Sequence, residues 1–124
     1  MGTSTSPKTF TASEAIAKKL RVSIVAASST DPVGVEIADA TTHGIGINEV
    51  VVASGDLCAI DLFSSGKSNE VVAAGAFAVG ATIYPAAGGK VDDAVSGVPL
   101  GIAVEAATAD GDIVEIIPVV NTDT

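Results

Sequence analysis

Short runs of branched apolar residues, interrupted by Gly, Asp and Ser, recur along the whole chain. The clearest runs are residues 100–104 and 113–117, which are separated by small residues and an Asp-Gly-Asp. Runs bounded in this way are typical of paired strands, because Gly, Asn and Asp accept a positive φ at low cost. Helical periodicity is scarce. The pattern therefore predicts an all-β protein, a compact barrel or sandwich of short strands with at most one short helical turn.

One pattern occurs twice in the chain. Gly46-Ile-Asn-Glu and a later Gly55-Asp are echoed by Gly101-Ile and Gly111-Asp, and an apolar run follows each Gly-Asp. The offsets are 101 − 46 = 55 and 111 − 55 = 56, so one register fits both ends. Upstream, Ala-Ile-Ala at 15–17 resembles Ala-Phe-Ala at 76–78, an offset of 61. We expect a single β domain over 13–119 built from two degenerate repeats, at about 13–62 and 70–119.

The stretch from 11 to 20 is open to two interpretations. Thr11 and Glu14 have capping-box spacing, which favours a short helix. The matching segment of the second repeat contains Gly75 and Gly80, which favour a single turn followed by a strand. The strands expected beyond this stretch are residues 21–26, 33–38, 45–52, 57–62, 70–73, 82–84 and 90–91, followed by the second unit over 99–119.

Charge divides the chain into two unequal parts. Lys8, Lys18, Lys19 and Arg21 are four of the six basic residues, and Glu14 is the only acid before position 22. The remainder has 14 acids and two bases, a net charge of 2 − 14 = −12, so it would repel nucleic acid. Residues 1–12 are polar and rich in Ser and Thr, which predicts a flexible basic arm that contacts an acidic neighbour or is simply solvated. Residues 120–124 are expected to form a polar tail.

No pattern for catalysis, a cofactor or a metal is present. Cys58 is the only Cys and lies in an apolar alternation, so we expect a buried thiol without a disulfide. His43 is the only His, too few ligands for zinc. Gly66-Lys67-Ser68 resembles the end of a phosphate-binding loop, but Asp61 stands where that motif needs Gly. No secretory signal or membrane-length apolar run occurs, so we expect synthesis in the cytoplasm and no membrane partner. Because no catalytic pattern is present, we also expect no enzymatic activity.

Together these residues resemble the tailed-phage capsid cement, or head decoration, proteins. The resemblance covers about residues 13–119. The matching segments are residues 15–17 (Ala-Ile-Ala), 38–40 (Ala-Asp-Ala), 46–49 (Gly-Ile-Asn-Glu), 54–56 (Ser-Gly-Asp), 75–81 (Gly-Ala-Phe-Ala-Val-Gly-Ala), 89–91 (Gly-Lys-Val) and 100–114 (Leu-Gly-Ile-Ala-Val-Glu-Ala-Ala through Asp-Gly-Asp-Ile-Val).

The resemblance implies a structural virion protein, made in the host cytoplasm, that binds the outside of an assembled phage head. It implies the major capsid protein and copies of the chain itself, as a homotrimer, as partners. From the charge division we expect Lys8, Lys18, Lys19 and Arg21 to contact the shell or a neighbouring protomer. An apolar edge at Val50, Val51 and Val52 would add protomer contacts. The alternatives are a small-molecule- or sugar-binding β module, which predicts a pocket with convergent polar groups, and a phage tail or fibre module.

Overall fold

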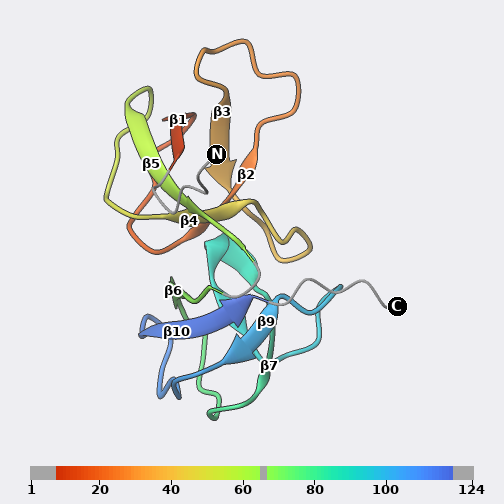
Figure 1. The fold of residues 1–124 in the computed structure, drawn as a ribbon. Coiled ribbons are helices and arrows are strands. Elements are labelled where there is room, and N and C mark those ends of the chain that lie inside the picture. The colour runs from red at the N-terminus through yellow and green to blue at the C-terminus, as the bar shows by residue number, and fades with distance from the viewer. Residues whose placement is uncertain (1–7, 65–66, 119–124) are drawn as a thin grey trace.

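The chain folds into two small β lobes, one following the other in sequence (Figure 1). The computed structural model describes residues 8–64 and 67–118. Lobe 1 comprises residues 8–62 and lobe 2 comprises residues 69–118. Within the described residues the helical content is one 3-10 turn, η1 (Ala87–Gly89), and all other elements are strands. The expected all-β class with at most one helical turn is therefore confirmed.

Lobe 1 is a closed barrel of five strands. These are β1 (Lys8–Ala12), β2 (Arg21–Ile24), β3 (Gly34–Ile37), β4 (Gly46–Asn48) and β5 (Leu57–Leu62). Their order is β1-β3-β2-β4-β5, and the antiparallel pairing of β1 with β5 closes the barrel. Inward-facing side chains alternate with exposed ones and fill the interior, as small barrels require. The largest core side chains include Phe10, Ile16, Val22, Val35 and Ile60.

Lobe 2 repeats this arrangement as a five-stranded sheet. Its strands are β6 (Asn69–Val72), β7 (Thr82–Pro85), β8 (Val91–Asp92), β9 (Gly101–Ala103) and β10 (Ile113–Pro118), in the order β6-β10-β9-β7-β8. Only a parallel bridge between Ala73 and Val91 links β6 to β8, whereas β1 and β3 pair as strands in lobe 1. Lobe 2 is therefore an incompletely closed version of the lobe 1 barrel.

Several backbone hydrogen bonds of lobe 1 have direct equivalents in lobe 2. Ile16 and Val52 exchange reciprocal backbone bonds of 3.0 Å, and so do Phe77 and Ala107. The offsets, 77 − 16 = 61 and 107 − 52 = 55, are those of the sequence repeat. Because these pairings recur in both lobes, residues of the paired segments in one lobe have defined counterparts in the other. The two-repeat construction predicted from the sequence is thus present in the fold.

The Gly-Asp turns of the two repeats show why glycine is needed there. Gly55 has a φ of 91° and donates to Ala12 O at 2.7 Å. Its counterpart Gly111 has a φ of 101° and donates to Ala73 O at 2.8 Å. Residues with a side chain rarely adopt this positive φ. The twice-used Gly-Asp therefore places the start of β5 against β1, and the start of β10 against β6.

Some predictions of local structure from the sequence were wrong. The expected flexible arm of residues 1–12 includes β1, in which Phe10 is 4% exposed and Ala12 is fully buried. These two side chains alternate with Thr9 and Thr11, a pattern typical of a half-buried strand. Of the two interpretations of 11–20, the structure has the turn followed by a strand: residues 13–20 form no helix, Ile16 pairs with Val52, and β2 begins at Arg21. Strand β4 also ends at Asn48, well before the expected position 52. Residues 1–7 and the tail 120–124 lie outside the described residues.

We predict that Gly101→Ala destabilises the protein by about 2 kcal/mol, because a Cβ at this position overpacks the sheet. The added carbon would lie 3.0 Å from the carbonyl carbon of Ile117 and closer still to its oxygen, and both belong to the backbone of β10. Urea denaturation followed by circular dichroism measures the change.

Gly75→Ala is the matched control in the same lobe. Its Cβ would meet the Asp92 carboxylate at an ordinary 3.6 Å, so stability should stay equal or rise by up to about 1 kcal/mol. Equal effects of the two substitutions would contradict the steric explanation.

Candidate functional site

Asn48 joins two loops of lobe 1 that are distant in sequence. Its side chain is fully buried, and its Nδ2 donates to the carbonyl oxygens of Ile16 at 3.2 Å, Ala17 at 3.0 Å and Val50 at 2.6 Å. The backbone carbonyl oxygen of Asn48 accepts the Lys19 N–H at 2.6 Å. Because buried amides hold their partners in fixed geometry, the loops at 16–19 and 49–52 behave as one unit.

These two loops present a small exposed surface, which we call the loop surface. It consists of Ala17, Lys18, Val50 and Val51. The two valines are 57% and 73% exposed, unusually high for adjacent apolar residues held in ordered loops. Three of the predicted contact residues, Lys18, Val50 and Val51, are thus brought together by the fold. Asn48, which holds them there, was overlooked in the sequence although it stands in the Gly-Ile-Asn-Glu segment at 46–49.

The side chain of Lys19 forms two ion pairs. Its Nζ lies 3.0 Å from Glu49 Oε1 and 3.5 Å from Glu70 Oε1, so it links lobe 1 to lobe 2. Burial lowers the pKa of Lys19, but the two carboxylates outweigh burial and leave the pKa above its ordinary value. Lys19 also has a φ of 66°, and its counterpart in lobe 2 is Gly80 with a φ of 85°. Its role is at the seam between the lobes, beside the loop surface.

Arg21 was expected on the surface, and this expectation was wrong. The side chain is fully buried, and its guanidinium donates only to backbone carbonyls. The acceptors are Lys90 at 2.9 Å, Asp39 at 3.0 Å, Ala86 at 2.7 Å, His43 at 3.2 Å and Thr42. Two of these belong to lobe 2 and three to lobe 1. Burial lowers the pKa of Arg21 to about 10, so the group stays charged at neutral pH.

Two further predicted contact residues, Val52 and Lys8, lie outside the loop surface. Val52 is 7% exposed and belongs to the barrel core, because it faces inward opposite Ile16. It is therefore not available to a partner. Lys8 is exposed at the start of β1, in the pair with Ile60, and is separate from the loop surface.

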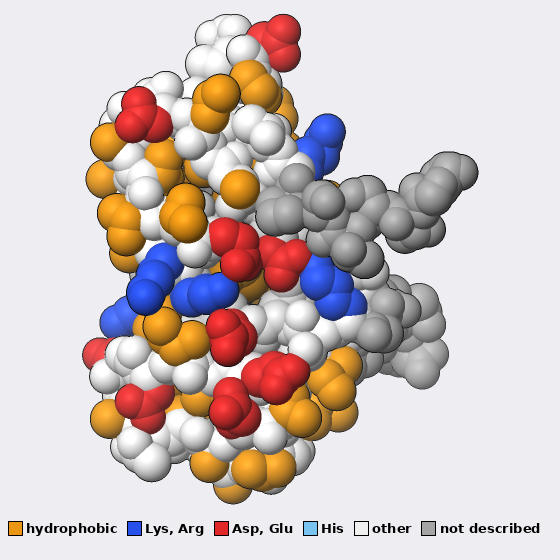
Figure 2. All heavy atoms as spheres, turned by 60° about the vertical axis from the view of Figure 1, so that its left-hand side comes forward, with side chains coloured by type: hydrophobic (Ala, Val, Ile, Leu, Met, Phe, Trp, Pro, Cys, Tyr) orange, Lys and Arg blue, Asp and Glu red, His pale blue; other side chains and the backbone are white. Residues whose placement is uncertain are grey.

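The seam between the lobes combines an apolar contact with polar bonds. Ile47, on β4 of lobe 1, is fully buried in the core of lobe 2. Asp61 accepts a bond from Asn69 Nδ2 at 3.0 Å and pairs with Lys67. Ser96 Oγ donates to Ala40 O at 2.7 Å. On the face shown in Figure 2, Lys and Arg side chains gather at the waist between the lobes, next to Asp and Glu. Many of the charged side chains thus bond to other groups of the same chain.

The described residues contain no arrangement typical of catalysis. Among residues 8–64 and 67–118, no group of three or more His, Cys, Asp or Glu side chains could hold a metal ion. Cys58 is buried, and burial raises the pKa of its thiol, which makes it a poor nucleophile. His43 Nε2 lies 2.8 Å from Val98 O, in the contact between the lobes. In the same part of the chain, no helix is long and apolar enough to cross a lipid bilayer.

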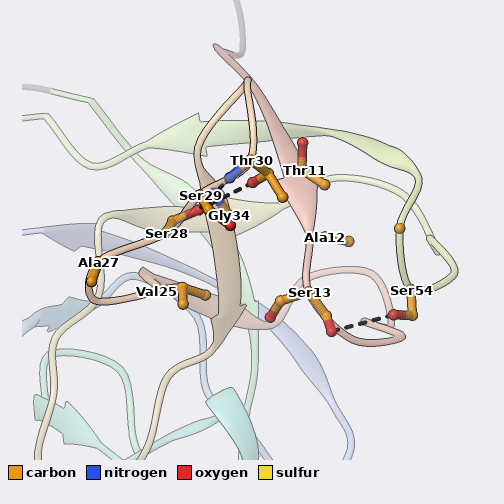
Figure 3. Close-up of a pocket in the computed structure, with 11 residues that line it drawn as sticks. Thr11, Ala12, Ser13, Val25, Ala27, Ser28, Ser29, Thr30, Gly34 and Ser54 are labelled. Carbon is orange, nitrogen blue, oxygen red and sulfur yellow. Dashed lines mark hydrogen bonds between the residues drawn. The ribbon is translucent and has the colours of Figure 1, made fainter.

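A hollow of about 360 Å³ lies at the end of lobe 1 between β1 and the segments at 25–34 and 54–55 (Figure 3). Its walls are Ala, Val, Gly, Ser and Thr, without an ionisable or aromatic side chain. Several of its hydroxyl groups are already bonded within the chain: Ser28 Oγ accepts from Gly34 N at 2.8 Å, and Ser54 Oγ donates to Ser13 O at 3.2 Å. A sugar or metabolite would find few free polar groups here.

Comparison with known proteins gives the molecule its family. A family model described as phage cement protein matches residues 3–118. The chain belongs to the phage cement protein family. Its role is therefore that of a capsid cement, or decoration, protein, a structural component of phage particles. No curated protein matches its sequence.

A solved structure supports the fold of this cement protein. The N base of the head fiber protein gp8.5 of bacteriophage phi29 is 18% identical and superposes with a TM-score of 0.77. The match covers 90% of this chain and 92% of that one. At this identity the likeness concerns the fold, including both lobes.

For this cement protein we predict that Arg21→Met lowers the free energy of unfolding by about 3 kcal/mol or more. The substitution leaves several buried carbonyl oxygens without a donor, each of which costs about 1 to 3 kcal/mol when unsatisfied. Lys18→Met, an exposed neighbour, should change stability by no more than about 0.5 kcal/mol. Urea denaturation measures both variants, and a small effect of Arg21→Met would show that the seam does not need the guanidinium.

Proposed function

We propose that this cement protein binds the outer surface of an assembled phage head, contacts the major capsid protein there, and acts as a homotrimer. The match of the cement family over nearly the whole chain is the observation that carries this proposal. The fold likeness to the base of a phage head fiber supports a position on the head. The lack of a catalytic or metal-binding cluster among the described residues favours work done through outer surfaces.

The mechanism is stabilisation by binding. A protein that binds the assembled lattice but not its free subunits stabilises the lattice by the free energy of binding. Each copy needs only a modest contact, because the copies of an oligomer bound together gain avidity. A rigid body that keeps its own charged groups in internal bonds suits this role, since few groups have to reorganise on docking.

The loop surface is the contact that we assign to the shell. Val50 and Val51 supply exposed apolar area, and Lys18 supplies a positive charge on a molecule with a net charge of −9. Asn48 fixes both loops, so little conformational entropy is lost when the surface is covered. Lys8, at the start of β1, adds a second positive charge to lobe 1.

We predict that Val51→Asp weakens binding to emptied, expanded heads by at least about tenfold, because it places a charge at the centre of the apolar contact. Lys18→Glu should weaken binding by a smaller factor that shrinks as salt is raised. Co-sedimentation of purified protein with the heads measures both.

Leu57→Asp is the matched control, since Leu57 is 62% exposed in the same lobe but lies outside the loop surface. Equal losses for Val51→Asp and Leu57→Asp would refute the assignment of the loop surface. Wild-type protein that fails to co-sediment with any assembled head would refute the proposed function itself.

A further inference from the structure

One face of lobe 1 is covered by lobe 2, whereas the same face of lobe 2 is open. In lobe 1 this face lies on β4 and β5, where Ile47 is fully buried and Asp61 bonds to Asn69 of lobe 2. The repeat offsets give the counterparts of Ile47 and Asp61: 47 + 55 = 102 and 61 + 56 = 117. These are Ile102 and Ile117, which are 45% and 42% exposed.

The open face of lobe 2 carries three exposed apolar side chains, with Glu115 beside them. Ile102 of β9 and Ile117 of β10 stand directly opposite each other in the ladder. Val104, the counterpart of Glu49, is 41% exposed. Val104 and Ile117 also line a shallow hollow of about 320 Å³, whose other walls are Lys67, Ser68 and Glu115. We call Ile102, Val104 and Ile117 the β9–β10 face. An exposed apolar patch that is covered in the sister repeat indicates an interface.

We propose that the β9–β10 face docks on lobe 1 of a second copy of this chain. The proposal rests on the homotrimer proposed above and names the contact that would build it. A lobe of this same fold is what covers the corresponding face within one chain. At two of the seam positions lobe 1 has charges, Glu49 and Asp61, whereas lobe 2 has Val104 and Ile117. Copies with a net charge of −9 repel one another less where Val104 and Ile117 replace these two carboxylates.

The repeat also locates the receiving surface. The residues of lobe 2 that meet lobe 1 at the seam include Asn69, Ala86 and Lys90. Their counterparts in lobe 1 are found by subtraction: 69 − 61 = 8, 86 − 61 = 25 and 90 − 56 = 34, that is Lys8, Val25 and Gly34. Val25 and Gly34 line the 360 Å³ hollow (Figure 3). The receiving surface is therefore this hollow together with the exposed start of β1.

The contact between copies also differs from the seam in its backbone hydrogen bonds. At the seam, Val72 N donates to Lys19 O at 3.0 Å, whereas the counterpart Thr11 N already donates to Val33 O at 3.1 Å within lobe 1. Side chains rather than this backbone bond therefore carry the contact between copies. Because it joins two different surfaces, it is heterologous, and such contacts close into a ring when the rotation between copies allows it. In the homotrimer, three of them close the ring.

Cross-linking between two single-cysteine variants tests the contact. Asp61 and Asn69 are bonded at the seam, so their counterparts Ile117 and Lys8 should be neighbours across two copies. We expect a mixture of Ile117→Cys and Lys8→Cys to give a covalent dimer with a short bis-maleimide, in solution or on heads. Cys58 is buried and should leave the wild type unlinked. A mixture of Ile117→Cys with Leu57→Cys is the control, since Leu57 is 62% exposed but lies outside the loop surface and is not a counterpart of any residue at the seam.

Ile102→Lys gives an independent test. It should weaken self-association at least about tenfold, measured by sedimentation or native mass spectrometry, while Leu57→Lys leaves it unchanged. Circular dichroism checks that both variants keep the fold.

The absence of a specific cross-link, in solution or on heads that are occupied normally, overturns the inference but leaves the proposed function standing. Protection of Ile117→Cys by heads without a cross-link identifies the shell as the occupant and also overturns it. A cross-link in solution without head binding supports the inference and refutes the proposed function.

Discussion

The structure depends on a positive charge that is buried between its two lobes. The guanidinium of Arg21 satisfies five backbone carbonyl oxygens, three in its own lobe and two in lobe 2. A buried arginine is tolerated only when its donors are fully used, and the rigid fork of the guanidinium makes this possible. The carbonyls in turn lose their hydration when the lobes meet. Arg21 therefore makes the position of lobe 2 a condition for the stability of lobe 1.

The two repeats have kept their backbone and diverged in the side chains that face the seam. Reciprocal bonds at Ile16 and Val52 have counterparts at Phe77 and Ala107, while the seam positions have changed. Arg21 corresponds to Thr82, and Asp61 corresponds to Ile117. Backbone pairing tolerates few changes because each buried N–H and C=O needs a partner. Surface positions are free of that constraint, so one repeat could specialise in holding its sister and the other in presenting an apolar face.

A cement protein needs stable outer surfaces rather than a reactive centre, and the chemistry of this chain agrees. Its thiol is buried, its single His lies in the contact between lobes, and the hollow in lobe 1 has small, mostly satisfied side chains. Two groups of exposed apolar residues form patches, the loop surface held by Asn48 and the β9–β10 face, while others such as Leu57 and Val95 lie elsewhere. Such patches on a strongly acidic molecule are suited to contacts that exclude water without bringing like charges together.

The sequence by itself determined the strand pattern, the twofold repeat and the family resemblance. These follow from local rules, because glycines with positive φ, Gly-Asp turns and alternating apolar residues act over a few positions. It also indicated three of the residues on the loop surface. Only the tertiary structure decided that Lys8 starts a barrel strand, that Val52 faces inward and that Arg21 is buried. The physical reason is that a charged side chain can be buried only where carbonyls from distant segments converge, and no local pattern records that convergence.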